Sequence, residues 1–331
     1  AALSERSAPP LKSDIFHTIS FSFTPTSGRE GRLHGLPSLL FHVKHYFLYK
    51  KLLFFAAICY TVSYPIKNTA GEMILAKTVA IVNQKGGVGK TTTAVNLTAA
   101  LGAKGYKTLL IDIDPQGNST SGFGINKREL AKSSYNVLIG GCPAREAIIK
   151  TEFDNVSVMP SSMDLAGAEL ELVDIDKRES KLKTAIAPVK DEFDFILLDC
   201  PPSLGLITLN GLCAADSLMV PIQCEFFALE GLAQLISTVR TVKRLYNPYI
   251  EIEGVLLTMY DGRLNLTQQV VDEVKKCFPK KVYSTFIPRN VRLSEAPSYG
   301  QPVMYYDRSS KGSSAYSALA DEFLKLNGKG I

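Results

Sequence analysis

From residue 73 onward, short apolar runs alternate with longer amphipathic stretches along the chain. This alternation is typical of parallel strands joined by helices that cover both faces of one sheet. The apolar runs predict strands over 78–83, 107–113, 156–159, 194–199, 216–222, 252–258 and 282–287. The amphipathic stretches predict helices over 90–104, 126–131, 143–150, 163–173, 179–191, 205–214, 228–246, 265–278 and 313–326. We therefore expect an α/β fold with one doubly wound, mostly parallel sheet and helices on both faces.

Residues 1–72 follow no sustained period and are rich in Ser, Pro, His and aromatic residues. Their apolar run at 52–60 is too short to span a bilayer and lies far from the N-terminus for a targeting signal. All six methionines stand at or after Met73. We therefore expect a single folded domain over 73–331, with 1–72 an upstream extension outside the fold or a mis-assigned start. A membrane-associating leader and an organellar transit segment are the alternatives.

The net charge of +5 is unevenly distributed over the 331 residues. Residues 1–72 carry eight Lys and Arg against four Asp and Glu, which leaves 29 against 28 in residues 73–331. A nearly neutral body argues against indiscriminate polyanion binding. All four histidines lie within residues 1–72, which excludes imidazole general bases and His-ligated metals from the predicted domain. The six cysteines form no C-x-x-C pair and are predicted to be mainly buried, reduced thiols.

A glycine-rich segment at 85–92, KGGVGKTT, follows the first apolar run. A glycine turn between a strand and a helix directs backbone N–H groups at phosphates. In such a loop Lys90 reaches the β- and γ-phosphates, and the Thr91 hydroxyl binds Mg²⁺. Gln84 replaces the first glycine of the usual G-x-x-x-x-G-K-[ST] pattern, and Lys85 adds a second lysine. The segment predicts a nucleoside triphosphate site with more positive charge than one triphosphate usually recruits.

Carboxylates follow two further predicted strands. Asp112 and Asp114 are two residues apart at a strand end and therefore face the same side. One of them can hold the water shell of Mg²⁺ while the other orients an attacking water. Asp199 ends an apolar strand in the manner of a Walker-B carboxylate that reaches Mg²⁺. Without a histidine, hydrolysis depends on positioning and electrostatics, to which Lys85 contributes from its own subunit or from a facing one.

These segments together resemble a known family, the deviant Walker-A ATPases of the ParA/MinD class, which have a P-loop NTPase fold. The segments that carry the resemblance are 85–92 (KGGVGKTT), 112–118 (DIDPQGN) and 199–203 (DCPPS). Two further stretches, 260–263 (YDGR) and 287–297 (IPRNVRLSEAP), look like the Soj-type chromosome-partitioning ParA branch. The match runs from about Lys77 to Phe323, and residues 1–72 match nothing in the family.

The resemblance implies an ATP-dependent sandwich dimer in which Lys85 crosses to the nucleotide of the other subunit. Asp114 would orient the water, while Asp112 and Asp199 would support Mg²⁺ together with Thr91. Lys85, Lys90 and Asp114 are the implied catalytic residues. The implied ATP contacts are Lys85, Gly86, Gly87, Val88, Gly89, Lys90, Thr91 and Thr92 at the phosphates, with Pro288 and Asn290 at the adenine.

The implied activity is slow ATP hydrolysis stimulated by a ParB-type centromere-binding partner. In that family the ATP-bound dimer binds double-stranded DNA without sequence preference, which implies a cytoplasmic, nucleoid-associated protein. Basic residues gather in the final third of the chain, and Arg263 and Arg292 are the expected DNA contacts. The competing interpretation is a solvated surface balanced by acidic residues such as Asp261 and Glu295.

Three rival functions require features of their own. A MinD-like membrane-associated positioning ATPase would need a basic amphipathic C-terminal helix. The segment 318–331 is short and ends in glycines, so it predicts a packing helix and no stable membrane association. A redox role like that of the nitrogenase iron protein would need cysteines at a dimer axis, and Cys200 and Cys213 lack those surroundings. A plain DNA-binding module would not need the phosphate loop and its carboxylates.

Overall fold

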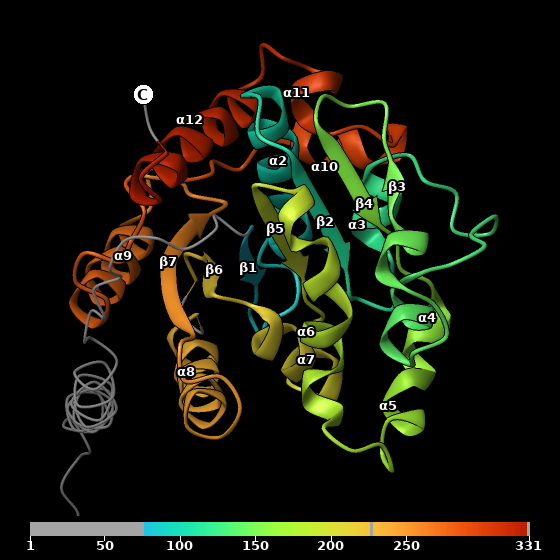
Figure 1. The fold of residues 1–331 in the computed structure, drawn as a ribbon. Helices are drawn as coiled ribbons and strands as arrows, with labels where there is room; N and C mark the ends of the chain where they lie inside the picture. The colour runs from blue at the N-terminus through green and yellow to red at the C-terminus, as the bar shows by residue number, and fades with distance from the viewer. Residues whose placement is uncertain (1–75, 226–227, 330–331) are drawn as a thin grey trace, which may run out of the picture. The chain divides into compact units, whose positions relative to one another are not determined.

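A sheet of seven strands forms the centre of the computed structural model, which describes residues 76–225 and 228–329 (Figure 1). The strands are β1 (Lys77–Ile81), β2 (Thr108–Asp112), β3 (Ile149–Lys150), β4 (Val156–Met159), β5 (Phe195–Asp199), β6 (Ser217–Gln223) and β7 (Glu251–Thr258). Their order is β3-β4-β2-β5-β1-β6-β7, and all neighbours pair in parallel except β3 with β4. The predicted α/β fold class is confirmed. The expected extension at 1–72 lies outside the described residues.

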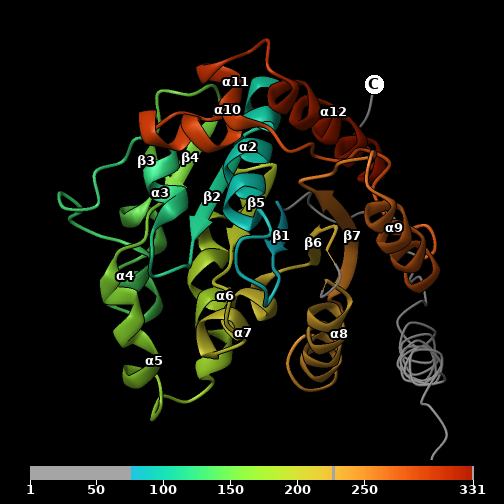
Figure 2. The ribbon, with the colours of Figure 1, turned by 180° about the vertical axis from the view of Figure 1, so that it is seen from behind.

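Helices cover both faces of this sheet, as Figures 1 and 2 show. The α-helices are α2 (Lys90–Ala103), α3 (Asn118–Gly122), α4 (Ser134–Leu138), α5 (Ala168–Glu171), α6 (Lys181–Ile186), α7 (Leu206–Ala214), α8 (Ala228–Leu245), α9 (Asn265–Cys277), α10 (Val291–Glu295), α11 (Val303–Tyr306) and α12 (Lys311–Leu326). Short 3₁₀ helices are η1 (Ala144–Ala147), η2 (Met163–Gly167), η3 (Arg178–Ser180), η4 (Ala187–Glu192) and η5 (Ala296–Tyr299).

The strands alternate their side chains between two apolar cores, one on each face. In β5, Phe195 and Leu197 pack on the side of α2 and α12, whereas Ile196 and Leu198 pack on the side of α6, α7 and α8. Because both faces are buried, the central strands are apolar runs rather than alternating ones. Six of the seven predicted strands are accordingly found within two residues of their expected bounds.

The last helix, α12, packs along α2. Tyr316 and Phe323 are fully buried, and Phe323 meets Phe195 edge-on with ring centroids 5.2 Å apart. The Tyr316 hydroxyl lies 3.2 Å from the Thr93 hydroxyl of α2. The apolar face of the C-terminal helix is therefore used in the core, as the sequence predicts. Within the described ranges, no helix has the length and apolar character needed to cross a bilayer.

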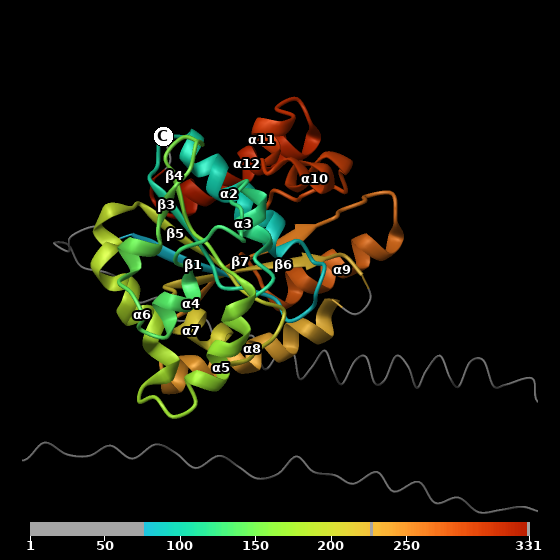
Figure 3. The same ribbon diagram turned by 90° about the vertical axis from the view of Figure 1, so that its right-hand side faces the viewer.

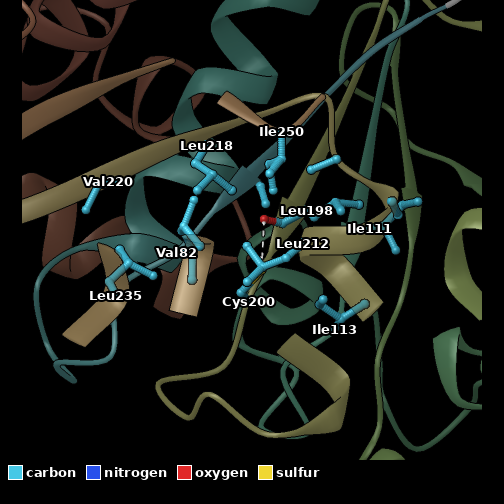
Figure 4. Packing of buried hydrophobic residues seen from close by; sticks show 14 of the residues in the cluster. Val82, Ile111, Ile113, Leu198, Cys200, Leu212, Leu218, Val220, Leu235 and Ile250 are labelled. Carbon is cyan, nitrogen blue, oxygen red and sulfur yellow. Dashed lines mark hydrogen bonds between the residues drawn. The ribbon is translucent and has the colours of Figure 1, made fainter. Parts of the chain in front are cut away.

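Two buried thiols, Cys200 and Cys213, lie in the apolar core on the side of α6, α7 and α8. Figure 4 shows Cys200 among Leu198, Ile113 and Leu212, with its sulfur 3.9 Å from the Leu198 carbonyl oxygen. Burial raises the pKa of the Cys200 thiol far above its usual range, and raises that of Cys213 to about 11. Among the described cysteines, Cys200, Cys213, Cys224 and Cys277 are buried, as predicted.

The segment 282–287 is not a strand, contrary to prediction. It runs beside β7, but the backbone hydrogen bonds between them are widely spaced. Tyr283 N donates to the Val255 carbonyl oxygen (3.0 Å), and Ile287 N donates to that of Leu257 (2.8 Å). A continuous ladder does not form, and isolated bridges remain at Val282 and Pro288.

The helix predicted at 126–131 is also wrong. The Asn126 side chain accepts from Arg128 N (3.1 Å), and its carbonyl accepts from Glu129 N (3.1 Å). This asparagine turn satisfies locally the groups that a helix would use. The short helices α3, α4, α10 and α11 were not predicted.

Candidate nucleotide-binding site

The loop between β1 and α2 has the backbone that a phosphate cradle needs. Gly87 and Gly89 adopt left-handed φ angles of 72° and 87°, which disfavour any residue with a Cβ. Nothing lies within 4 Å of where a Cβ on Gly86 or Gly87 would stand, so open space faces the loop. The Val88 carbonyl accepts from the Thr258 hydroxyl (2.8 Å), which ties the loop to the end of β7. The loop is therefore a preformed, open cradle.

Lys90 begins α2 and is buried at the base of the cradle. Its ammonium donates to the Lys85 carbonyl oxygen at 3.1 Å, and the residue is 6% exposed. Burial lowers the pKa of Lys90, and the nearby Asp199, Cys200 and Asp114 partly offset this. No acidic residue stands in the first turn of α2, so the positive end of this 14-residue helix is uncompensated. An anion such as a triphosphate suits this position.

Asp112 and Asp199 lie opposite each other at the ends of β2 and β5. Asp112 is fully buried and accepts from Thr120 N (2.9 Å), the Thr120 hydroxyl (2.7 Å) and Asp114 N (3.1 Å). Burial raises the pKa of Asp112 to about 6 despite these bonds. The pKa of Asp199 is raised to about 8, mainly because the carboxylate is buried and secondly because Asp112 repels its negative charge. Two buried carboxylates thus lie side by side, an arrangement that a nearby cation stabilises.

The carboxylates fit a divalent cation. One oxygen of Asp199 accepts from the Ser119 hydroxyl, whereas Oδ1 is buried with no hydrogen-bond partner among the described residues. No group of three or more His, Cys, Asp or Glu side chains in the described ranges forms a metal cage. Two carboxylates and the Thr91 hydroxyl leave the other positions to phosphate oxygens and water, which is how Mg²⁺ is usually bound.

Asp114 is placed next to this pair by its own turn. Its Oδ1 accepts from Gln116 N at 3.0 Å, and its N–H donates to Asp112. The side chain is 7% exposed and close enough to Lys90 to stabilise the ammonium charge. The structure thus brings Lys90, Asp112, Asp114 and Asp199 together, as expected for the ends of neighbouring parallel strands.

Lys85 points to a different group. Its Nζ lies 2.8 Å from Glu225 Oε2, just beyond the end of β6. Sequence reasoning missed Glu225. Glu225 stands three residues after the strand predicted at 216–222, at the same edge of the sheet as Asp114 and Asp199, which marks it as a candidate site residue without identifying its partner.

The remaining nucleotide candidates lie on α2 and near α10. Thr92 is in the first turn of α2, where its carbonyl accepts from Asn96 Nδ2 at 2.8 Å. Pro288 is bridged to Tyr260 after β7. Asn290 precedes α10, and its Oδ1 is buried without a hydrogen-bond partner among the described residues. An acceptor left without a donor in this way suits a ligand that carries N–H groups.

The two arginines expected to contact DNA are each paired with acidic residues. Arg263 makes two bonds to Asp261, at 2.9 and 2.6 Å, and is 89% exposed. Arg292 bonds Glu295 at 2.7 Å and Asp307 at 3.2 Å. Figure 3 shows α10 and the segment between β7 and α9 toward the edge of the sheet where the strands end and the phosphate loop follows β1. The surface at both positions is therefore balanced in charge.

The fold and site define a P-loop ATP hydrolase. A family described as an AAA domain matches residues 76–252. The chain is 54% identical over 248 residues to the sporulation initiation inhibitor protein Soj of Bacillus subtilis, covering 75% of this chain and 98% of that protein. It is 50% identical over 259 residues to the chromosome partitioning protein ParA of Myxococcus xanthus, covering 78% and 92%. The chain belongs to the ParA/MinD class of ATPases, in its Soj-type partitioning branch.

A solved structure shows the same arrangement of elements. The chain resembles cobyrinic acid a,c-diamide synthase of Mycobacterium smegmatis, crystallised with ADP and magnesium, with a TM-score of 0.68 and 36% identity. The comparison covers 78% of this chain and 97% of that one.

Proposed function

We propose that this partitioning ATPase is a DNA-binding switch driven by ATP. The Mg²⁺–ATP-bound chain forms a face-to-face dimer, the dimer binds double-stranded DNA without sequence preference, and slow hydrolysis releases it. The observation that carries the proposal is that the two lysines of one phosphate loop occupy different surroundings. Lys90 is buried in its own site, whereas Lys85 lies at the surface, where a second subunit can reach it.

Within one subunit, each residue of the site has a distinct task. The N–H groups of the 85–92 loop and the Lys90 ammonium bind the phosphates. Thr91, Asp112 and Asp199 would hold Mg²⁺, which when bound would supply charge neutralisation at the phosphoryl oxygens. Asp114 orients the attacking water, and its own turn fixes the direction of its carboxylate. Because the transition state of phosphoryl transfer is loose, positioning and charge suffice without an imidazole base.

Lys85 supplies the missing charge from the facing subunit, as an arginine finger does. A free subunit then hydrolyses ATP slowly because its transition state lacks one cation. Pairing of subunits and occupancy by ATP become one coupled event. A ParB-type partner that acts on the dimer would accelerate the release of DNA, and the protein would be associated with the nucleoid in the cytoplasm.

The direct test is phosphate release from Mg²⁺–ATP by the chain alone, with DNA, with a ParB-type protein, and with both. We expect slow turnover alone and faster turnover with both additions. A rate that neither addition changes would contradict the proposal.

The DNA surface predicts the effect of a charge reversal. Arg292→Glu is expected to weaken DNA binding about tenfold in an ATP-dependent mobility shift, and to reduce its salt dependence by about one phosphate contact. ATP hydrolysis without DNA should not change. Arg145→Glu is the control, because Arg145 is an exposed arginine paired with Glu192. Unaltered mobility shifts with Arg292→Glu would remove this residue from the interface.

We also propose that residues 73–331 form a single ATPase domain. Ala76, directly before β1, is already part of the fold, because its N–H donates to the Lys190 carbonyl oxygen (3.0 Å). A chain of residues 73–331 is expected to be folded and to hydrolyse ATP at the rate of the full chain. Circular dichroism and phosphate release check this. A truncated chain that fails to fold would show that residues 1–72 contribute to the domain.

The packing of α12 supports a partitioning role over a MinD-like membrane role. Leu319, Ala320 and Phe323 are fully buried, so the apolar face of this helix is committed to the core. A helix that inserts into a bilayer interface needs that face to be available.

A further inference from the structure

Lys85 is held against its own subunit by contacts at both ends. Its N–H donates to Asn83 Oδ1 at 3.0 Å, and Asn83 in turn donates to the Pro221 carbonyl oxygen of β6 at 2.7 Å. Its ammonium donates to Glu225 Oε2 at 2.8 Å. Figure 2 shows the phosphate loop beside β6, the neighbour of β1 in the sheet. The backbone and the side chain of Lys85 are thus both anchored to the end of β6.

Glu225 is itself oriented for this contact. Its second oxygen, Oε1, accepts from the Gln223 side-chain amide, so both carboxylate oxygens are engaged. Lys85 and Glu225 have exposed side-chain fractions of 32% and 49%. An ion pair this exposed is weak, and a competing group with more negative charge can displace it. A γ-phosphate on a facing subunit is such a group.

We propose that Glu225 is a positioning residue that holds Lys85 against its own subunit until a second copy of the chain presents its nucleotide. Dimerisation then exchanges the Glu225 carboxylate for a phosphate. This inference rests on the proposed function, because it requires Lys85 to act on the facing nucleotide. Since the ion pair must break before the dimer forms, its free energy opposes dimerisation and sets the protein concentration at which subunits pair.

The first test removes the charge of Glu225 and keeps its shape. In Glu225→Gln with Mg²⁺ and a non-hydrolysable ATP analogue, the protein concentration at half-dimerisation should fall about two- to fivefold, the range expected for an exposed ion pair. Sedimentation equilibrium measures it. Glu251→Gln is the matched control, because Glu251 bonds Lys243 at 2.9 Å with similar exposed fractions, 38% and 34%. The control should dimerise as the wild type does.

A second test measures how accessible the Lys85 ammonium is to a chemical label. Lys85 in the nucleotide-free protein should be acetylated faster by a dilute N-hydroxysuccinimide ester in Glu225→Gln than in the wild type. Mass spectrometry reports the rate, and Lys243 in the same sample is the reference. An unchanged labelling rate would show that Glu225 does not hold Lys85. A half-dimerisation concentration that stays the same or rises would show that Glu225 does not oppose pairing. Either result overturns the inference.

The variant Lys85→Ala separates this inference from the proposed function. If Lys85→Ala dimerises like the wild type, the trans role of Lys85 fails. If Lys85→Ala does not dimerise while Glu225→Gln behaves as the wild type, the trans role holds and only the role of Glu225 fails.

Discussion

Replacing Asp114 with alanine is expected to lower ATP hydrolysis by about 10²- to 10⁴-fold, the usual contribution of a group that positions or accepts a proton. ATP binding should persist, because Lys90 and the loop N–H groups remain in place. The variant should therefore accumulate as an ATP-bound dimer. Phosphate release measures the loss of turnover, and size-exclusion chromatography with ATP measures the dimer.

The control for this variant is Asp164→Ala. Asp164 is an exposed carboxylate whose contact in the structure is the Ser162 hydroxyl (3.0 Å), and its loss should leave hydrolysis unchanged. Normal phosphate release by Asp114→Ala would assign the orientation of water to another group. Asp112 is the nearest alternative, because its carboxylate accepts from Asp114 N.

Lys90→Ala should lower the rate of ATP hydrolysis by a similar factor, but it should act already at the binding of ATP. The ammonium is buried beside Asp114 and Asp199, and it is the cation of the cradle that a single subunit provides to its own triphosphate. Loss of one preorganised charge of this kind costs about 10²- to 10³-fold in rate. Unlike Asp114→Ala, this variant should also lose ATP affinity and ATP-dependent dimerisation.

Binding of a fluorescent ATP analogue, followed by phosphate release, checks the Lys90 variant. Lys104→Ala is the control, because Lys104 caps the other end of α2 and pairs with Asp321 at 2.7 Å. If Lys90→Ala kept both nucleotide affinity and turnover, the cradle would not be the nucleotide site.

The buried strands were predictable because their physical signal is strong. Residues 195–198 are all apolar and all buried, and in an α/β fold such a short run is typical of a central parallel strand covered on both faces. The segment 282–287 shows where that signal fails. Tyr283 and Ile287 are buried at strand-like spacing, but whether a continuous ladder forms depends on the backbone of β7. The turn at 126–131 depends on one asparagine side chain, which periodicity does not detect.

The candidate site residues could be placed from the sequence because they stand at the ends of predicted strands. The side chains with which they form ion pairs could not be predicted in this way. Asp112, Asp114 and Asp199 stand where parallel strands terminate, so their convergence is expected from the sequence. That Lys85 pairs with Glu225 could not be read from the sequence, because it depends on side-chain direction across 140 residues. The same holds for the pairing of Arg292 with Asp307. The catalytic and DNA-binding roles of these residues stay predictions.

The packing of α2 against α12 has a consequence for how the protein is made. Thr93 of α2 and Tyr316 of α12 are in contact but lie 223 residues apart in the chain. The ribosome therefore completes Lys90 long before the helix that supports it exists. A nascent chain that stalls before α12 leaves uncovered the face of α2 that packs against Tyr316. Such a chain is expected to be a better substrate for proteolysis than the finished domain, which nucleotide can also stabilise.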